Sequence, residues 1–384
     1  MDKSRIKKLQ ADLRNPVLIK KKENLLYLTG RSFMHGYLLV RPRKDAEFSA
    51  EGRGRKSGVV FLGNGLEKID GVHSDILKNV GMYLKHQRVL EIEDVFSFAE
   101  HKYLGLKIKD KGLKIKAVRS PVDFQRQIKE PGEIRLVGKS MNIVGKVFDR
   151  VRREIKKPGM TEFRLANFIK SAGLKLGAED VSFPPIVACG ANAAVPHHVP
   201  SNKKLKPGES IIIDFGFKYK NYCSDFTRTV FLKKVSPRLE EAYNQVEKAY
   251  NSCMPLRASA SERSNLISGK GLLRRPARGG APRNDSIVTG NDLYQRAVDV
   301  LAEKHLDKYF IHSLGHGTGL EIHELPNLSP GSKDILQNGM VFSIEPGVYI
   351  PKLGGIRIED LVYLDKGECK KFIEASTKLE ENIL

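Results

Sequence analysis

The sequence has few cysteines and no long hydrophobic run. The cysteines are far apart and form no CxxC pair; they are Cys189, Cys223, Cys253 and Cys369. Their spacing excludes a disulfide scaffold and a thiolate zinc finger, and it is typical of a reducing cytosol. No apolar stretch approaches the roughly 18 residues that cross a bilayer. Because no apolar segment follows the basic N-terminus, we also expect no secretory signal, and hence a cytoplasmic protein without a membrane partner.

Positive charge is in excess and is spread along the chain. The 384 residues include 66 Lys and Arg against 45 Asp and Glu, so the formal net charge is +21. An excess of this kind can indicate nucleic-acid binding. However, the lysines are scattered, often lie beside acidic residues, and accompany no RNP-like or zinc-finger motif. We therefore expect no nucleic-acid partner.

The chain changes its pattern near Ser120-Pro121. The preceding residues alternate short apolar runs, which we interpret as strands, with turn signals and helix-length gaps; one such run is 24–30 (NLLYLTG). This pattern predicts a small α/β domain over 1–122. In the remainder, 123–384, helices are separated from strands that form hairpins, which predicts an α+β domain.

Four helices are predicted in the second domain. The first, over 132–156, is amphipathic and would bury one stripe of side chains: Val137, Met141, Val144, Phe148 and Val151. Thr161 is expected to cap the second helix, which would end near Gly177. The other two are predicted over 237–251 and 292–305.

Residues 254–283 interrupt the connection between the last two helices. The segment has no periodicity, and six Arg, one Lys and one Glu give it a charge of +6. Its composition predicts a disordered basic insertion. A sequence-level error and a functional basic arm are the alternatives. An insertion that replaced part of a packed helix would destabilise the domain and impair activity.

Acidic residues lie at the ends of apolar strands in the second domain. Asp214 ends the run SIIID, and Asp225 lies eleven residues later at the start of the next predicted strand. The two strands are expected to be antiparallel, which would bring these carboxylates together. A carboxylate after three isoleucines is costly unless a cation or a hydrogen-bond donor meets it.

One imidazole and two further carboxylates lie in similar apolar surroundings: His316, Glu345 and Glu359. Taken singly, an Asp before Phe-Gly is more often a turn residue, and a Glu before Pro-Gly more often caps a turn. Four carboxylates buried together would repel one another, and two divalent cations about 3.5 Å apart would supply the missing counter-charge. The five residues together therefore predict a dinuclear metal site.

These residues and the segments around them resemble the pita-bread-fold metallopeptidases, in the branch of Xaa-Pro aminopeptidases and prolidases. The matching segments are NAAVPHHVPS, KPGESIIIDFG, SDFTRT, FIHSLGHGTGLEIHELP, GMVFSIEPGVYIP and GGIRIED. The resemblance covers 123–384 apart from 254–283. It extends more weakly to the first domain, where NLLYLTG resembles a strand of the creatinase-type N-terminal domain. It implies a curved antiparallel sheet with outer helices, preceded by a smaller α/β domain.

The resemblance implies a role for each of the five residues. Asp214 would bind one ion through both oxygens, and Asp225 and Glu359 would bridge two ions. His316 and Glu345 would complete the second site. A hydroxide between the ions would attack the peptide bond before proline, with Glu345 as general base. The donor set suits Mn²⁺, which we expect, or Co²⁺ or Zn²⁺.

Three further histidines and one arginine match substrate-side positions of the family. His197 would contact the substrate and take part in catalysis, and His312 would line the proline pocket. His323 would contact the scissile peptide or its tetrahedral intermediate. Arg357 would pair with a ligand carboxylate. His198 is expected to point away from its neighbour His197 and to be structural.

Related folds with other functions are the alternatives. Methionine aminopeptidases share the five ligands but usually lack such an N-terminal domain. Creatine amidinohydrolases do not keep the full metal set, and non-catalytic relatives that bind nucleic acids or histones have lost ligands. The complete set here favours a Xaa-Pro peptidase, an expected homodimer acting on peptides with proline at the second position. The sequence leaves dipeptide against longer-peptide preference open.

One glycine-rich segment has a second interpretation. GHGTGL resembles a phosphate-binding loop only superficially, because no Lys-Ser or Lys-Thr follows it. Its glycines are better explained by close approach of the backbone to the metal centre.

Overall fold

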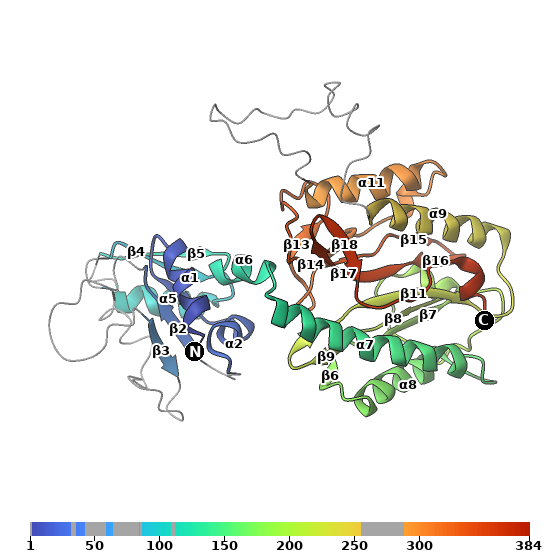
Figure 1. Ribbon diagram of the computed structural model, residues 1–384, viewed down its shortest axis with the longest axis horizontal. Coiled ribbons are helices and arrows are strands. Elements are labelled where there is room, and N and C mark those ends of the chain that lie inside the picture. The colour runs from blue at the N-terminus through green and yellow to red at the C-terminus, as the bar shows by residue number, and fades with distance from the viewer. Residues whose placement is uncertain are drawn as a thin grey trace, which may run out of the picture. The chain divides into compact units, whose positions relative to one another are not determined.

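The computed structural model describes residues 2–31, 36–42, 59–63, 84, 87–108, 112–254 and 288–384. Apart from Met254, the predicted insertion 254–283 lies outside the described residues. The chain divides into two compact units, Met1–Arg126 and Gln127–Leu384, and each is described by itself (Figure 1).

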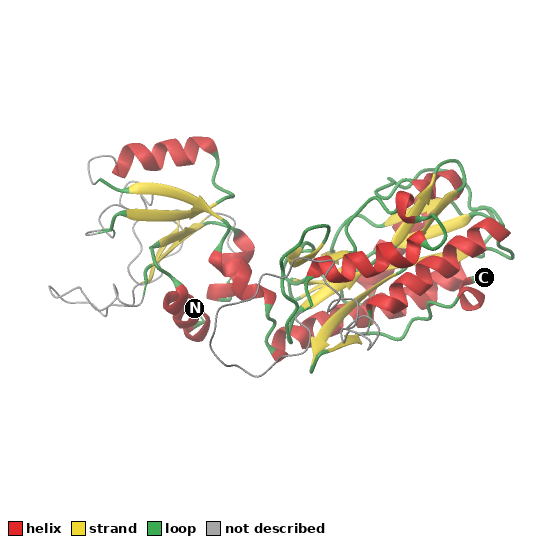
Figure 2. Ribbon diagram, turned by 90° about the horizontal axis from the view of Figure 1, so that it is seen from above, coloured by secondary structure: helices red, strands yellow, loops and turns green. Residues whose placement is uncertain are grey.

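The first unit is a mixed sheet with helices, as the strand pattern predicts. Its strands are β1 (Val17–Ile19), β2 (Gly36–Val40), β3 (Val59–Gly63), β4 (Val89–Glu93) and β5 (Lys114–Val118). They follow the order β3-β2-β1-β4-β5, with parallel pairing of β4 to both neighbours and antiparallel pairing elsewhere. Its helices are α1 (Lys3–Asp12), α2 (Lys22–Thr29), α5 (Phe98–Ile108) and α6 (Pro121–Gln127). Figure 2 shows helices beside these strands.

The strand predicted over 24–30 is wrong, because these residues belong to helix α2. Leu25 and Leu28, one helical turn apart, are both buried, and Gly30 ends the helix at φ 70°. The Glu93 carboxylate accepts two backbone N–H groups that precede the helix, at 2.7 and 2.6 Å. A short apolar run does not by itself distinguish a buried strand from a buried helix.

The second unit is built on a larger antiparallel sheet. Within the described residues its strand order is β13-β12-β14-β17-β11-β8-β7, with β18 also paired to β17. These strands are β7 (Ile186–Cys189), β8 (Ser210–Asp214), β11 (Phe226–Phe231), β12 (Gly315–Gly317), β13 (Glu324–Leu328), β14 (Val341–Ile344), β17 (Glu359–Asp365) and β18 (Glu368–Lys371). The smaller strands are β6 (Asp180–Val181), β9 (Phe217–Tyr219), β10 (Tyr222–Cys223), β15 (Gly347–Ile350) and β16 (Gly354–Arg357).

Helices cover this sheet. They are α7 (Pro131–Glu154), α8 (Glu162–Lys175), α9 (Pro237–Cys253) and α11 (Gly290–Ala302), with 3₁₀ turns η3 (Gly190–Ala194), η4 (Asp307–Tyr309) and η5 (Leu379–Asn382). Figure 1 shows α9 beside α11 and α7 beside α8, with strands between the two pairs. The four helices agree with the sequence prediction, and the predicted stripe of α7 is buried throughout. Thr161 caps α8 by accepting the N–H of Arg164. Among the described residues, no helix has the length and apolarity to cross a membrane.

The central strands of the sheet are buried on both faces, and the polar site lies on these strands. Every residue of β8 and of β11 is buried. On one side of β11, Phe226 packs edge-on against Phe148 of α7. On the same side, where Phe226 and Ile344 each lie opposite Asp360, an apolar cluster joins Phe342 and Ile344 of β14 to the buried faces of α9 and α11. Polar side chains in such strands must find partners within the protein.

Candidate active site

Strand register brings three carboxylates to one face of the sheet. Strand β11 lies between β8 and β17, and Thr227 pairs with Asp214 on one side and with Glu359 on the other. Asp225 lies two residues before Thr227 and therefore points to the same face. The two strands predicted to be antiparallel are so, and their pairing places Asp214 opposite Thr227.

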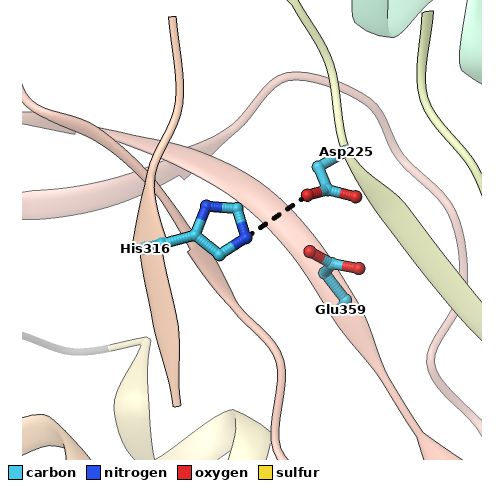
Figure 3. A group of neighbouring side chains, drawn as sticks. All are labelled: Asp225, His316 and Glu359. Carbon is cyan, nitrogen blue, oxygen red and sulfur yellow. Dashed lines mark ion pairs between the residues drawn. The ribbon is translucent and has the colours of Figure 1, made fainter. Parts of the chain in front are cut away.

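The neighbouring strands add an imidazole and a fourth carboxylate. His316 of β12 places its Nε2 atom 3.5 Å from Asp225 Oδ2 and 3.4 Å from Glu345 Oε1. Figure 3 shows the His316 ring facing the carboxylates of Asp225 and Glu359. One ligand atom from each of these three residues lies within 4.8 Å of the others.

All nine residues that the sequence assigns to the site line one cavity of about 630 Å³. Besides the five candidate ligands, they include His197, His312, His323 and Arg357. The cavity is of the size that encloses small ligands in proteins.

Burial and mutual repulsion make this carboxylate cluster unfavourable without counter-charge. Burial, followed by the charges of neighbouring carboxylates, raises the pKa of Asp225 and of Glu359 well above their ordinary values. Burial and Asp214 raise the pKa of Glu345 to about 7. Arg357 provides a positive charge beside the cluster, but it faces several negative groups.

The free atoms of the cluster fit divalent cations. Within the described residues, Asp214 Oδ1 and Glu359 Oε1 are buried and have no hydrogen-bond partner. Burial and the neighbouring His323 lower the pKa of His316 to about 3, so the imidazole is neutral and its Nε2 lone pair can bind a metal. Carboxylate oxygens with one imidazole nitrogen suit Mn²⁺, Co²⁺ or Zn²⁺. The residues present therefore fit the metals that the sequence predicts.

The raised carboxyl pKa values predict how the stability of the metal-free protein varies with pH. Above about pH 7.5, one unit above the ordinary histidine pKa, histidines are almost entirely neutral in both the folded and the unfolded chain, so the carboxyls dominate. From that pH up to the pKa values of the site carboxyls in the folded protein, the folded protein binds more protons than the unfolded chain. The stability therefore falls as the pH rises. We expect the melting temperature after chelation to fall from about pH 7.5 to about pH 8.5, and to fall less with metal added. A melting temperature that rises over this range would contradict the carboxylate assignment.

Arg357 links the carboxylates to the substrate side of the cavity. It is almost fully buried, and its guanidinium donates to Asp214 Oδ2 at 2.5 Å, to Thr227 Oγ1 at 3.2 Å and to the Tyr349 hydroxyl at 2.6 Å. Thr227 in turn donates to Glu359 Oε2 at 2.6 Å. Arg357 therefore holds Asp214 directly and Glu359 through one hydroxyl.

His312 continues this hydrogen-bonded chain. Its Nδ1 lies 2.8 Å from the Ser313 carbonyl oxygen and its Nε2 lies 2.9 Å from the Tyr349 hydroxyl. Burial and Arg357 lower the pKa of His312 to about 4, so the ring is neutral at pH 7. Since a carbonyl oxygen only accepts, Nδ1 donates to it and Nε2 accepts from Tyr349. The order of donation is therefore Arg357 to Tyr349 to His312.

The other two histidines face the same cavity. The rings of His323 and His316 are 4.3 Å apart and perpendicular. The charge of His197 contributes to lowering the pKa values of His312 and His323, so all four imidazoles lie close together. His198 also borders the cavity, but its Nε2 donates to the Glu162 carboxylate at 2.9 Å.

The glycines beside His316 allow strand packing. A Cβ at Gly315 would lie 2.0 Å from the carbonyl oxygen of Ser343, and one at Gly317 would lie 2.0 Å from that of Leu325. The predicted reason, close approach to the metal centre, stays a prediction, and these contacts give a separate reason for the two glycines. The backbone approaches the neighbouring strands, which only glycine permits.

A second charged layer lies on the other face of the same strands, and the sequence interpretation missed it. Arg228 and Asp360 alternate with Thr227 and Glu359 along β11 and β17. The Arg228 guanidinium donates to Asp360 Oδ1 at 2.8 Å and to the carbonyl oxygens of Thr227 and Glu359 at 2.9 and 2.6 Å. Tyr250 of α9 donates to Asp360 Oδ2 at 2.5 Å. The only signal in the sequence was that Asp360 directly follows the site residue Glu359 in an apolar strand.

Comparisons with known proteins identify a metallopeptidase family. The model of metallopeptidase family M24 matches residues 135–260 and 284–366. Its gap, 261–283, falls inside the predicted insertion. A Xaa-Pro dipeptidase from Pyrococcus furiosus is 31% identical over 375 residues, which cover 96% of this chain and 94% of that protein.

Solved structures are similar over nearly the whole chain. A Xaa-Pro dipeptidase from Bacillus anthracis has a TM-score of 0.79 and 26% identity, with 98% of both chains covered. An X-Pro aminopeptidase from Thermotoga maritima has a TM-score of 0.72 and 25% identity, covering 95% of this chain and 96% of that chain. These similarities confirm the predicted pita-bread fold. From the family match, the extent of similarity and the cluster of metal-binding side chains, it follows that this chain belongs to metallopeptidase family M24.

Proposed function

We propose that this chain is a metal-dependent Xaa-Pro peptidase, which hydrolyses the bond between an N-terminal residue and a following proline. The observation that carries the proposal is the buried cluster of Asp225, His316, Glu345 and Glu359 in a peptide-sized cavity. Family M24 and the names of the related proteins support a peptidase of this specificity. Divalent ions held by these side chains would supply a nucleophile at neutral pH and polarise the scissile carbonyl.

The residues around the ligands orient the peptide and move protons. Glu345 has a pKa of about 7 in the absence of metal, and we assign it the role of general base and proton carrier. His197, His312 and His323 line the cavity; we assign His197 and His323 to contacts with the scissile peptide, and His312 to the proline pocket. Arg357 keeps Asp214 and Thr227 in position.

The finer assignments are part of the same proposal. We assign 1–122 to a creatinase-type N-terminal domain and 123–384 to the catalytic domain. The ions are two Mn²⁺, the active form is a homodimer, and the enzyme acts in the cytosol. The composition of 254–283 supports an insertion outside the catalytic fold, which leaves the site able to assemble.

Release of the N-terminal residue from short peptides tests the proposal. With Mn²⁺ present, we expect cleavage of Met-Pro and Met-Pro-Ala but not of Met-Ala or Met-Ala-Ala. Chelation should abolish the cleavage, and Mn²⁺ should restore it. The ratio of the two proline peptides distinguishes a dipeptidase from an aminopeptidase. Equal cleavage of Met-Ala-Ala would instead indicate a methionine aminopeptidase, and a metal-loaded protein that cleaves none of the four would contradict the proposal.

A further inference from the structure

Glu162 is a fully buried carboxylate beside the cavity. It is the first residue of α8, and its side chain is 0% exposed. Burial by itself raises its pKa, but hydrogen bonds from Ser201, the Cys189 amide and His198 outweigh burial and bring the pKa to about 2. Glu162 is therefore negatively charged at neutral pH, and its hydrogen bonds are charge-assisted.

The two oxygens of Glu162 connect three segments. Oε1 accepts the Cys189 N–H at 2.8 Å and the Asn192 side-chain amide at 3.0 Å. Oε2 accepts His198 Nε2 at 2.9 Å, the Ser201 N–H at 3.0 Å and the Ser201 hydroxyl at 2.6 Å. The end of β7, the turn η3 and the loop 195–201 are thus held by one side chain.

Apart from Glu162, the loop 195–201 is held by Arg357 at Pro196 and by backbone hydrogen bonds at Val195, His198 and Ser201. It lies outside the helices and strands of the structure, and Val199 in its middle is 80% exposed. It nevertheless forms part of the cavity wall through Pro196, His197 and Pro200. The Glu162 carboxylate therefore keeps part of the cavity wall in place from behind.

His197 depends on this anchor for its position. No hydrogen bond is made by its ring within the described residues, yet the ring is close enough to Asp214, His312 and His323 to affect their pKa values. Its backbone is held on either side: Arg357 donates to the Pro196 carbonyl oxygen at 3.4 Å, and His198 donates to Glu162. A side chain without its own hydrogen bond takes its position from its backbone.

We infer that Glu162 and His198 are positioning residues for substrate binding, which act by fixing His197 against the peptide. His198 is thus functional, although the sequence interpretation left it structural. The inference rests on the proposed function, because it assigns His197 a contact with the peptide. It assigns no metal-binding role to His198 or to Glu162.

Kinetics of single and double variants test the inference. His198→Ala should raise the KM for Met-Pro about tenfold, the effect of losing one charge-assisted hydrogen bond, with the metal content unchanged. His198→Gln, which keeps a donor at the same reach, should restore most of the loss. In a His197→Ala background, His198→Ala should change KM less than twofold, because residues that act through one another are not additive. His101→Ala, at an exposed site in the first unit, is the matched control.

Hydrogen exchange gives a readout that does not depend on activity. His198→Ala and the milder Ser201→Ala should both speed amide exchange across 195–203, while the control should not. Multiplicative effects in the double variant, an unchanged KM, or unchanged exchange would each overturn the inference. A wild type that binds metal but cleaves no Xaa-Pro peptide would overturn the proposed function. The exchange would then still decide whether Glu162 anchors the loop.

Discussion

Asp225→Asn is expected to abolish Mn²⁺-dependent cleavage of Met-Pro and, at the same time, to stabilise the metal-free protein. Asp225 lies beside His316 and Glu359, and one of its oxygens is 3.5 Å from His316 Nε2. Removing a group that acts directly at the reacting centre lowers kcat by about a thousandfold or more. The same substitution removes a carboxylate from the buried cluster. Burial and the neighbouring carboxylates raise the pKa of this group, so its ionised form is unfavourable there. We therefore expect the melting temperature after chelation to rise by at least about 2 °C at pH 8.

Metal binding separates these two effects. Added Mn²⁺ should raise the melting temperature of the wild type, since an ion that binds only the folded state stabilises it, and should raise that of the variant much less. Asp149→Asn, at an exposed position on α7, should leave activity and both melting temperatures unchanged. Retained metal-dependent activity in Asp225→Asn would contradict its place among the ligands. A lower melting temperature of the metal-free variant would contradict the repulsion argument.

Arg228→Met is expected to lower the free energy of unfolding by about 3–5 kcal/mol, the cost of removing one partner of a buried ion pair. Both Arg228 and Asp360 are almost completely buried. The substitution leaves the Asp360 carboxylate without its guanidinium and removes the guanidinium's hydrogen bonds to the carbonyl oxygens of Thr227 and Glu359. Urea denaturation followed by circular dichroism measures the loss, because the chain has no Trp for fluorescence.

A second substitution tests whether the charge of Asp360 is the cause. Asp360→Asn should cost less in the Arg228→Met background than in the wild type, because the charge that it removes then keeps only Lys371, 3.2 Å from Asp360 Oδ2, as an ion-pair partner. Arg135→Met, at an exposed position on α7, should change the free energy of unfolding by no more than about 0.5 kcal/mol. Equal costs of Asp360→Asn in both backgrounds would show that the two residues do not depend on each other.

Short-range patterns in the sequence predicted most helices of the second unit and the strands of its site. The stripe of α7 and the cap at Thr161 are local features, so their side chains could be assigned from spacing alone. The run 24–30 failed because Leu25 and Leu28 suit a buried strand and a buried helix equally well. Its helical state depends on packing and on Glu93, which lies far away in the sequence.

The candidate site was also visible from the sequence, because its residues lie in distinctive segments. All nine predicted site residues line one cavity, and their individual roles remain predictions. Except for Arg357, which was expected to pair with a ligand carboxylate and does so with Asp214, the residues that hold them were not visible. Tyr349 is one hydroxyl in an apolar strand, and nothing near it in the sequence names His312 or Arg357 as its partners.

Residue type and spacing thus indicated which side chains carry the chemistry, and the fold alone revealed what holds them in place. His198 and Glu162 are 36 positions apart, and Arg228 and Asp360 are 132 positions apart. A buried charge is stable only when a partner meets it. Which partner does so depends on how strands and helices pack, and distance along the chain carries no information about that.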